Sequence, residues 1–200
     1  ISACLQRGRQ ALVLVPEIGL TPQTLARFSA RLPVPVHVLH SNMSDGDRAR
    51  AWAAMASGIG RVLLGTRSAV FTPLPEAGLL IIDEEHDGSY KQQDGFHYHA
   101  RDVAIVRAKT LDVPILLGSA TPSLETLHNA GTGRYRHHRL LKRAGIAEPP
   151  AVRIVDVRKI RMQDGLGQTM LDGIRQCLAQ GGQALVFKNR RGYAPALLCH

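Results

Sequence analysis

Cysteines and long apolar runs are scarce in this sequence, and both shortages restrict the class of protein. The 200 residues include three cysteines, Cys4, Cys177 and Cys199. An odd, widely spaced set is no disulfide framework, so we expect a reducing compartment. No apolar run approaches the roughly 18 residues that a membrane span needs. Because the first ten residues also lack the apolar region of a signal peptide, we expect a cytoplasmic protein that makes no use of a membrane.

Aromatic residues are also few, at 4% of the chain, whereas basic residues are in excess. The net charge of +9 comes from 25 basic and 16 acidic residues. Residues 1–133 hold 12 of each sign, and residues 134–200 hold 13 basic but only 4 acidic residues. This local excess suggests an anionic partner for the last third of the chain, although a solvated basic face is equally consistent with charge alone.

Short runs rich in Val, Leu and Ile alternate with helical patterns. The runs are apolar throughout, as in strands buried on both faces, and the repeat predicts an α/β fold with a parallel sheet covered by helices on both faces. The predicted strands are 11–15, 36–39, 62–64, 79–82 and 115–117. The predicted helices are 21–31, 44–57 and 99–111, with Val103, Val106 and Leu111 near one face of the last.

Residues 144–150 (AGIAEPP) are small residues followed by two prolines, a pattern typical of a linker. After it we predict a strand at 153–157, a helix at 170–180 and a strand at 184–187. About 50 residues are too few for a complete α/β domain. We therefore expect one domain over 1–143, a linker over 144–150, and the beginning of a second domain over 151–200.

The strongest chemical signal is LLIIDEEH, residues 79–86, a buried strand that ends in three acids and a histidine. Ligands of open α/β sheets bind at the carboxyl ends of the strands. There, Asp83 can hold the water shell of a phosphate-bound Mg²⁺, and Glu84 can orient or deprotonate an attacking water. A lone acidic turn after a strand is the alternative; His86 and the motifs below argue against it.

Two hydroxyls, on Ser119 and Thr121, follow the predicted strand 115–117 within GSATPS. A hydrogen bond from His86 to either one would link this segment to the acidic residues. A helix cap at Thr121 or Ser123 is the other interpretation, and the two roles are compatible. Two further loops, PEIGLT (16–21) and GTRSAVF (65–71) with Arg67, offer N–H groups, a hydroxyl or a guanidinium to a phosphate of nucleic acid.

Residues 90–101 interleave aromatic and basic side chains immediately after the acids, an arrangement suited to stacking on bases and pairing with phosphates. The candidates for DNA contact are Tyr90, Lys91, Phe96, His97, Tyr98 and Arg101. The alternative is that Phe96 and Tyr98 anchor this loop on the first domain. A zinc site from Glu85 with His86, His97 and His99 matches no motif with a known mechanism.

Together, DEEHDGSYKQQDGFHYHARDVA, PEIGLTPQT, GTRSAVF, GSATPS and FKNRRGYAPALLCH resemble the primosomal replication-restart helicases, DExH enzymes of superfamily 2. The resemblance covers essentially the whole chain. It implies two RecA-like lobes and a bacterial cytoplasmic 3′-to-5′ DNA helicase. The implied cofactors are ATP and Mg²⁺, and the implied partners are single-stranded and forked DNA, primosome proteins and single-strand-binding protein. Asp83, Glu84 and His86 would be catalytic, and Ser119 and Thr121 would couple hydrolysis to strand movement.

Two family features are incomplete in the 200 residues. The phosphate loop Gly-x-x-x-x-Gly-Lys-Ser/Thr is absent, so we expect a truncated enzyme that alone does not hydrolyse ATP. Cys199 resembles the first ligand of the family's zinc insertion, but Cys199 and His200 cannot complete a four-ligand site. The remaining alternatives are a DNA- or partner-binding module without activity, or another superfamily 2 translocase, such as a type III restriction subunit.

Overall fold

The computed structural model describes residues 1–141, 150–158, 160, 162–163, 165–187. The chain divides into two compact units, Ile1–Arg139 and Leu140–His200, and each is described by itself. Most of the predicted linker lies outside the described residues, as do Cys199 and His200. The scheme of two lobes joined at 144–150 therefore stays a prediction.

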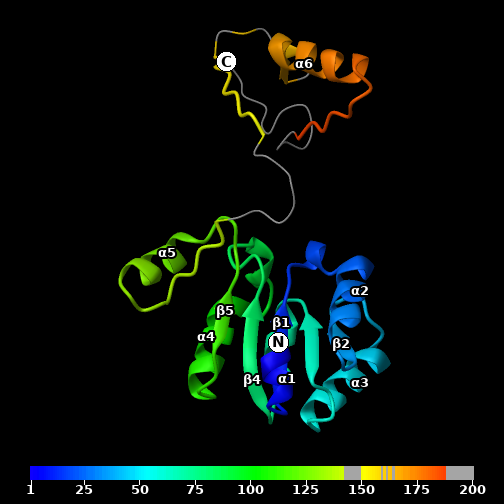
Figure 1. Cartoon of the computed structure of the whole chain (residues 1–200), viewed down its shortest axis with the longest axis vertical. Helices are drawn as coiled ribbons and strands as arrows, with labels where there is room; N and C mark the ends of the chain where they lie inside the picture. Colours follow the sequence, from blue (N-terminus) through cyan, green and yellow to red (C-terminus); the bar gives the residue numbers. More distant parts are fainter. Residues whose placement is uncertain (142–149, 159, 161, 164, 188–200) are drawn as a thin grey trace. The chain divides into compact units, whose positions relative to one another are not determined.

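The first unit is built on a five-stranded parallel sheet in the order β2-β3-β1-β4-β5 (Figure 1). The strands are β1 (Gln10–Leu14), β2 (Val36–Leu39), β3 (Val62–Gly65), β4 (Ala77–Ile82) and β5 (Ile115–Leu117). Each predicted strand of this unit is present, and the predicted α/β class is confirmed. All five residues of β1 are buried, because this strand has a neighbour on each side and a helical layer on each face.

Five helices and three short 3₁₀ segments connect the strands. They are α1 (Ser2–Gln6), η1 (Glu17–Gly19), α2 (Pro22–Arg31), α3 (Asp45–Ala56), η2 (Arg67–Phe71), η3 (Gly88–Tyr90), α4 (Ala100–Thr110) and α5 (Leu124–Gly131). Three helices begin at a hydroxyl that accepts the backbone N–H three residues on, as the sequence indicates at Ser123: the caps are Thr21, Ser44 and Ser123.

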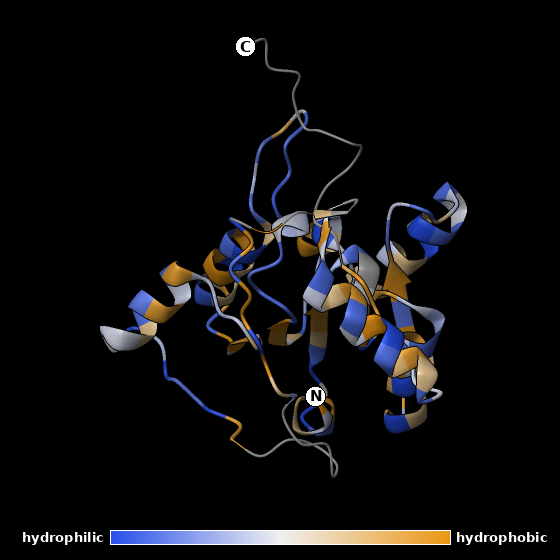
Figure 2. Cartoon of the chain, turned by 90° about the horizontal axis from the view of Figure 1, so that it is seen from above, coloured by the Kyte–Doolittle hydropathy of each residue, from blue (hydrophilic) through white to orange (hydrophobic). Residues whose placement is uncertain are grey.

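Alternate residues of β1 enter two different apolar clusters, and this places helices on both faces of the sheet. Leu12 packs in one cluster with Met55 of α3 and Ala104 of α4. Val13 packs in another with Phe28 of α2. Hydrophobic residues, orange in Figure 2, accordingly run through the strands of this unit.

The prediction of which face of helix α4 is buried is wrong. Val106 and Leu111 are 64% and 42% exposed, whereas Ala104 and Ala108 are buried against the sheet. Only Val103 of the predicted apolar face packs against the core. Alanines let the helix axis approach the strands closely, so close packing here favours the small side chains over the larger apolar ones.

The second unit contains the predicted helix, α6 (Gln168–Ala179), and a short antiparallel pair, β6 (Met162–Gln163) with β7 (Leu166–Gly167). The strands predicted at 153–157 and 184–187 are wrong: those residues carry no strand. Ile154 is 93% exposed, so this segment has neither a pairing partner nor a covering face. Among the residues that the structure describes, no helix has the length and hydropathy to cross a membrane.

Candidate functional site at the carboxyl ends of the strands

The ends of β1, β4 and β5 surround a cavity of about 860 Å³. Pro16 and Gly19 line it after β1, Asp83 and Glu84 after β4, and Thr121 after β5. In a parallel sheet the carboxyl ends lie at one edge, which brings together residues more than 100 positions apart. The cavity thus gathers three of the motifs that the sequence singles out.

Asp83 and Glu84 present their carboxylates at the turn that follows β4. The Asp83 N–H donates to the Leu14 carbonyl oxygen at 2.9 Å, which fixes the turn against β1. The Glu84 N–H donates to Asp83 Oδ1 at 3.1 Å. Glu84 has φ 45°, in the left-handed region that costs an L-residue roughly 1–2 kcal/mol. Such backbone strain is concentrated at functional sites, and here it orients the second carboxylate of the pair.

The His86 ring lies between the two hydroxyls of the GSATPS segment, as the sequence predicts. Its Nδ1 lies 2.7 Å from Ser119 Oγ, and its Nε2 lies 3.2 Å from Thr121 Oγ1. Nδ1 is also 3.6 Å from a carboxylate oxygen of Glu84. Each ring nitrogen thus has one hydroxyl as its hydrogen-bond partner. His86 therefore joins Glu84 to the β5 segment.

Glu85, the third acid, has a different environment that sequence reasoning missed. It is 1% exposed, and its carboxylate accepts hydrogen bonds from Arg101, Ser123 and Thr126. Burial raises the pKa of Glu85, but these hydrogen bonds outweigh it and hold the pKa below its ordinary value. No local pattern marks the partners of Glu85, since they lie 16 to 41 residues away.

Two residues predicted to contact DNA, Tyr90 and Arg101, are buried, and this corrects their assignment. Tyr90 is fully buried, and its hydroxyl donates to the Asp83 carbonyl oxygen at 2.7 Å. Burial raises the pKa of Tyr90 far above its ordinary value. Arg101 is 9% exposed and pairs with Glu85 at 3.0 Å. Arg67 is half-buried and donates to the Ser89 and Lys91 carbonyl oxygens at 3.0 and 3.2 Å, and its contact with DNA stays a prediction. These side chains hold the aromatic loop in place.

The rest of the aromatic loop stays open to a ligand. Phe96 is 77% exposed, and Lys91 and His97 are also exposed. Tyr98 is half-buried, with its ring 4.8 Å from that of Phe71 and 6.0 Å from that of Phe96. The loop therefore combines an anchored base with an exposed aromatic and basic tip.

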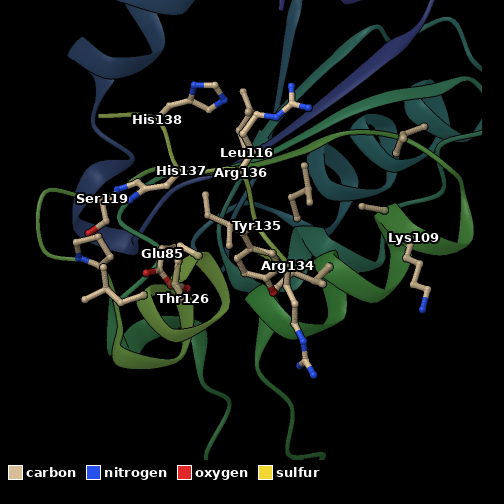
Figure 3. A pocket seen from close by; sticks show the side chains of 18 residues that line it. Glu85, Lys109, Leu116, Ser119, Thr126, Arg134, Tyr135, Arg136, His137 and His138 are labelled. Atoms are coloured by element: carbon tan, nitrogen blue, oxygen red, sulfur yellow. The ribbon is translucent and has the colours of Figure 1, made fainter. Parts of the chain in front are cut away.

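A second cavity, of about 530 Å³, lies beside Glu85 and is bordered by the extended segment 134–138 (Figure 3). Arg134, Arg136, His137 and His138 all line it. These residues begin the basic third of the chain. Within the described ranges, no three His, Cys, Asp or Glu side chains gather to hold a metal ion.

Curated relatives match the chain along nearly its whole length. It is 50% identical to Replication restart protein PriA of Haemophilus influenzae over 200 residues, which are all of this chain and 27% of that protein. The proteins of the same name from Chlamydia pneumoniae and Bacillus subtilis are 43% and 39% identical, over 99% and 100% of this chain. The chain thus spans about a quarter of the length of these relatives.

Among solved structures, the C-terminal domain of the DEAD-box protein Dbp5 matches 64% of this chain and 72% of its own, at 11% identity and a TM-score of 0.45. That similarity is too low to carry an argument about function. The DEAD/DEAH box helicase family matches residues 1–130, which is more than half of the chain and includes both the acidic residues and the GSATPS segment. The chain therefore belongs to the DEAD/DEAH box helicase family.

Proposed function

We propose that this chain is part of an ATP-dependent 3′-to-5′ DNA helicase that acts in primosome assembly and replication restart. Its first unit would be the first RecA-like lobe, and residues 151–200 would begin the second. The relatives named Replication restart protein PriA support this assignment. One structural observation carries the chemistry: Asp83, Glu84 and His86 meet Ser119 and Thr121 at the carboxyl edge of the sheet.

The residues of the cavity suit hydrolysis of a nucleoside triphosphate. Asp83 has an exposed carboxylate, the ligand type that holds the water shell of Mg²⁺. When bound, the ion would neutralise charge on the phosphates. Glu84 is placed to orient an attacking water and accept its proton. His86 lies between Glu84 and the two hydroxyls, and it would couple changes at the nucleotide to movement of the segment after β5.

Two parts of the proposed enzyme, the phosphate loop and the zinc site, are not among the described residues. A phosphate loop would be supplied by the longer protein, because the 200 residues contain none. Cys199 would contribute the first ligand of a zinc site there. Single-stranded and forked DNA, primosome proteins and single-strand-binding protein would be the partners, in the bacterial cytoplasm.

DNA binding would affect the nucleotide site through the aromatic loop. Its tip exposes Phe96 and His97, and Lys91 is exposed at its base. The base is joined to the acidic turn by the Tyr90 hydroxyl on the Asp83 carbonyl oxygen. Base stacking on the tip would therefore act on the backbone of the Mg²⁺-holding residue.

The test is ATP hydrolysis by the full-length protein, with Asp83→Asn and Glu84→Gln as variants. Both should abolish turnover while leaving DNA affinity close to normal, since these carboxylates act on the ion and water. Glu76→Gln is a matched control, because that exposed acid lies at the other end of the sheet, paired with Arg9. Near-normal turnover in either active-site variant would refute the assignment.

The same assay separates the alternatives. The 200-residue chain alone should show no turnover. A binding module predicts DNA affinity without turnover in the full-length protein as well. Another superfamily 2 translocase predicts DNA-dependent turnover without unwinding of a forked substrate.

A further inference from the structure

Glu85 is a buried charge that the proposed chemistry does not use. It lies between Glu84 and His86 in the chain, yet it is absent from the lining of the 860 Å³ cavity and is 1% exposed. A buried carboxylate is costly unless it is paired and hydrogen-bonded, so its position requires a compensating environment.

That environment comes from two helices. Arg101, the second residue of α4, donates to Oε2 at 3.0 Å. Ser123, the cap of α5, donates its N–H to Oε1 at 2.7 Å, and its hydroxyl lies 3.1 Å from Oε2. Thr126, in the first turn of α5, donates to Oε2 at 3.0 Å. Figure 3 shows Glu85 beside Thr126, with Ser119 close by. The carboxylate thus joins the acidic turn to α4 and α5.

The backbone of Glu85 adds a connection to the segment after β5. The Glu85 N–H donates to the Gly118 carbonyl oxygen at 3.0 Å, immediately before Ser119. With both its backbone and its side chain held, Glu85 fixes where the neighbouring His86 ring points. The ring then meets both hydroxyls, Ser119 and Thr121.

Arg101 extends this connection to the aromatic loop. The loop closes on itself through the Gln92 N–H and the Tyr98 carbonyl oxygen at 2.8 Å, and α4 begins two residues after Tyr98. A shift of the loop exit therefore moves Arg101, whose Nη1 bonds both Glu85 and the Ser123 hydroxyl at 2.7 Å.

We propose that Glu85 is a positioning residue which, through Arg101 and Ser123, aligns His86 with Ser119 and Thr121 and transmits the state of the aromatic loop to the nucleotide site. This proposal rests on the proposed function. It assigns Arg101 to the same link, in place of a contact with DNA.

The experiment measures ATP hydrolysis by the full-length protein with and without saturating oligo-dT, for Glu85→Gln, Arg101→Lys and the double variant. The readout is the ratio of the stimulated to the basal rate. Misfolded molecules lower both rates equally, so a merely structural role leaves this ratio unchanged. We expect each single variant to lower the ratio on the order of fivefold or more, the lower range of ordinary coupling between sites. The double variant should be no worse than the worse single one, because both break one link.

Thr126→Val is the matched control: it removes one hydrogen bond to the same carboxylate and the bond that the Thr126 hydroxyl accepts from Ser123. It leaves Arg101 and Ser123, the two donors of the proposed link, on Glu85. It should lower the melting temperature and keep the ratio. A normal ratio in both Glu85→Gln and Arg101→Lys overturns the proposal, as does an equal loss in Thr126→Val. If Glu85→Gln does not fold, the result for Arg101→Lys decides the test. That substitution keeps the positive charge and removes the planar guanidinium that bonds both Glu85 and Ser123. Turnover by Glu84→Gln would instead refute the proposed function.

Discussion

Replacing Tyr90 with phenylalanine separates an anchoring role for this residue from a DNA-stacking role. The substitution keeps the ring and removes only the hydroxyl that donates to the Asp83 carbonyl oxygen at 2.7 Å. A typical hydrogen bond contributes about 0.5–1.5 kcal/mol net, and a buried group left unpaired costs about 1–3 kcal/mol. We therefore expect the free energy of unfolding to fall by about 1–2 kcal/mol.

DNA affinity should respond differently. Tyr90 is fully buried, so no base can stack on it, and Tyr90→Phe should leave the Kd for single-stranded DNA nearly unchanged. Phe96→Ala is the contrast, because that ring is 77% exposed. Stacking contributes about 1–3 kcal/mol per base, so losing it should weaken binding several-fold to about a hundredfold.

Thermal melting and fluorescence anisotropy on the same full-length preparations measure both quantities. The DNA-stimulated rate of Tyr90→Phe should fall as well, since the hydroxyl joins the loop to the acidic turn. Weaker DNA binding at unchanged stability would refute the anchoring assignment and restore Tyr90 as a DNA contact.

Two further predictions concern stability. Ala104→Leu should destabilise the protein by about 1–3 kcal/mol through overpacking, whereas Val106→Leu, at a 64% exposed position of the same helix, should melt normally; equal melting of both would contradict the packing of α4. The lowered pKa of Glu85 means that its contribution to stability is present above its ordinary pKa and is lost as the pH falls through the lowered value. Acid titration of Glu85→Gln should accordingly show less loss of stability at low pH than the unsubstituted protein, and parallel titration curves would show that folding does not lower the pKa of Glu85.

Some side-chain contacts of this site can be predicted from the sequence, and others cannot. The hydrogen bonds of His86 to Ser119 and Thr121 join two motifs at the ends of parallel strands, because strand direction brings those ends to one edge and β4 pairs with β5. The roles of Tyr90 and Arg101 do not follow, since an aromatic or basic residue beside exposed ones has the same local pattern whether it faces solvent or the core.

The sequence by itself determined the five strands, the cap at Ser123 and the placing of the acids at the carboxyl edge, because apolar runs and caps are local signals. Only the tertiary structure decided which face of α4 is buried, because the helix packs so close to the sheet that small alanine side chains fit there better than valine. It also decided that 153–157 and 184–187 form no strand, because a strand requires a pairing partner. Likewise, it divided the three acids, leaving Asp83 and Glu84 at the cavity and burying Glu85 against donors that lie far along the chain.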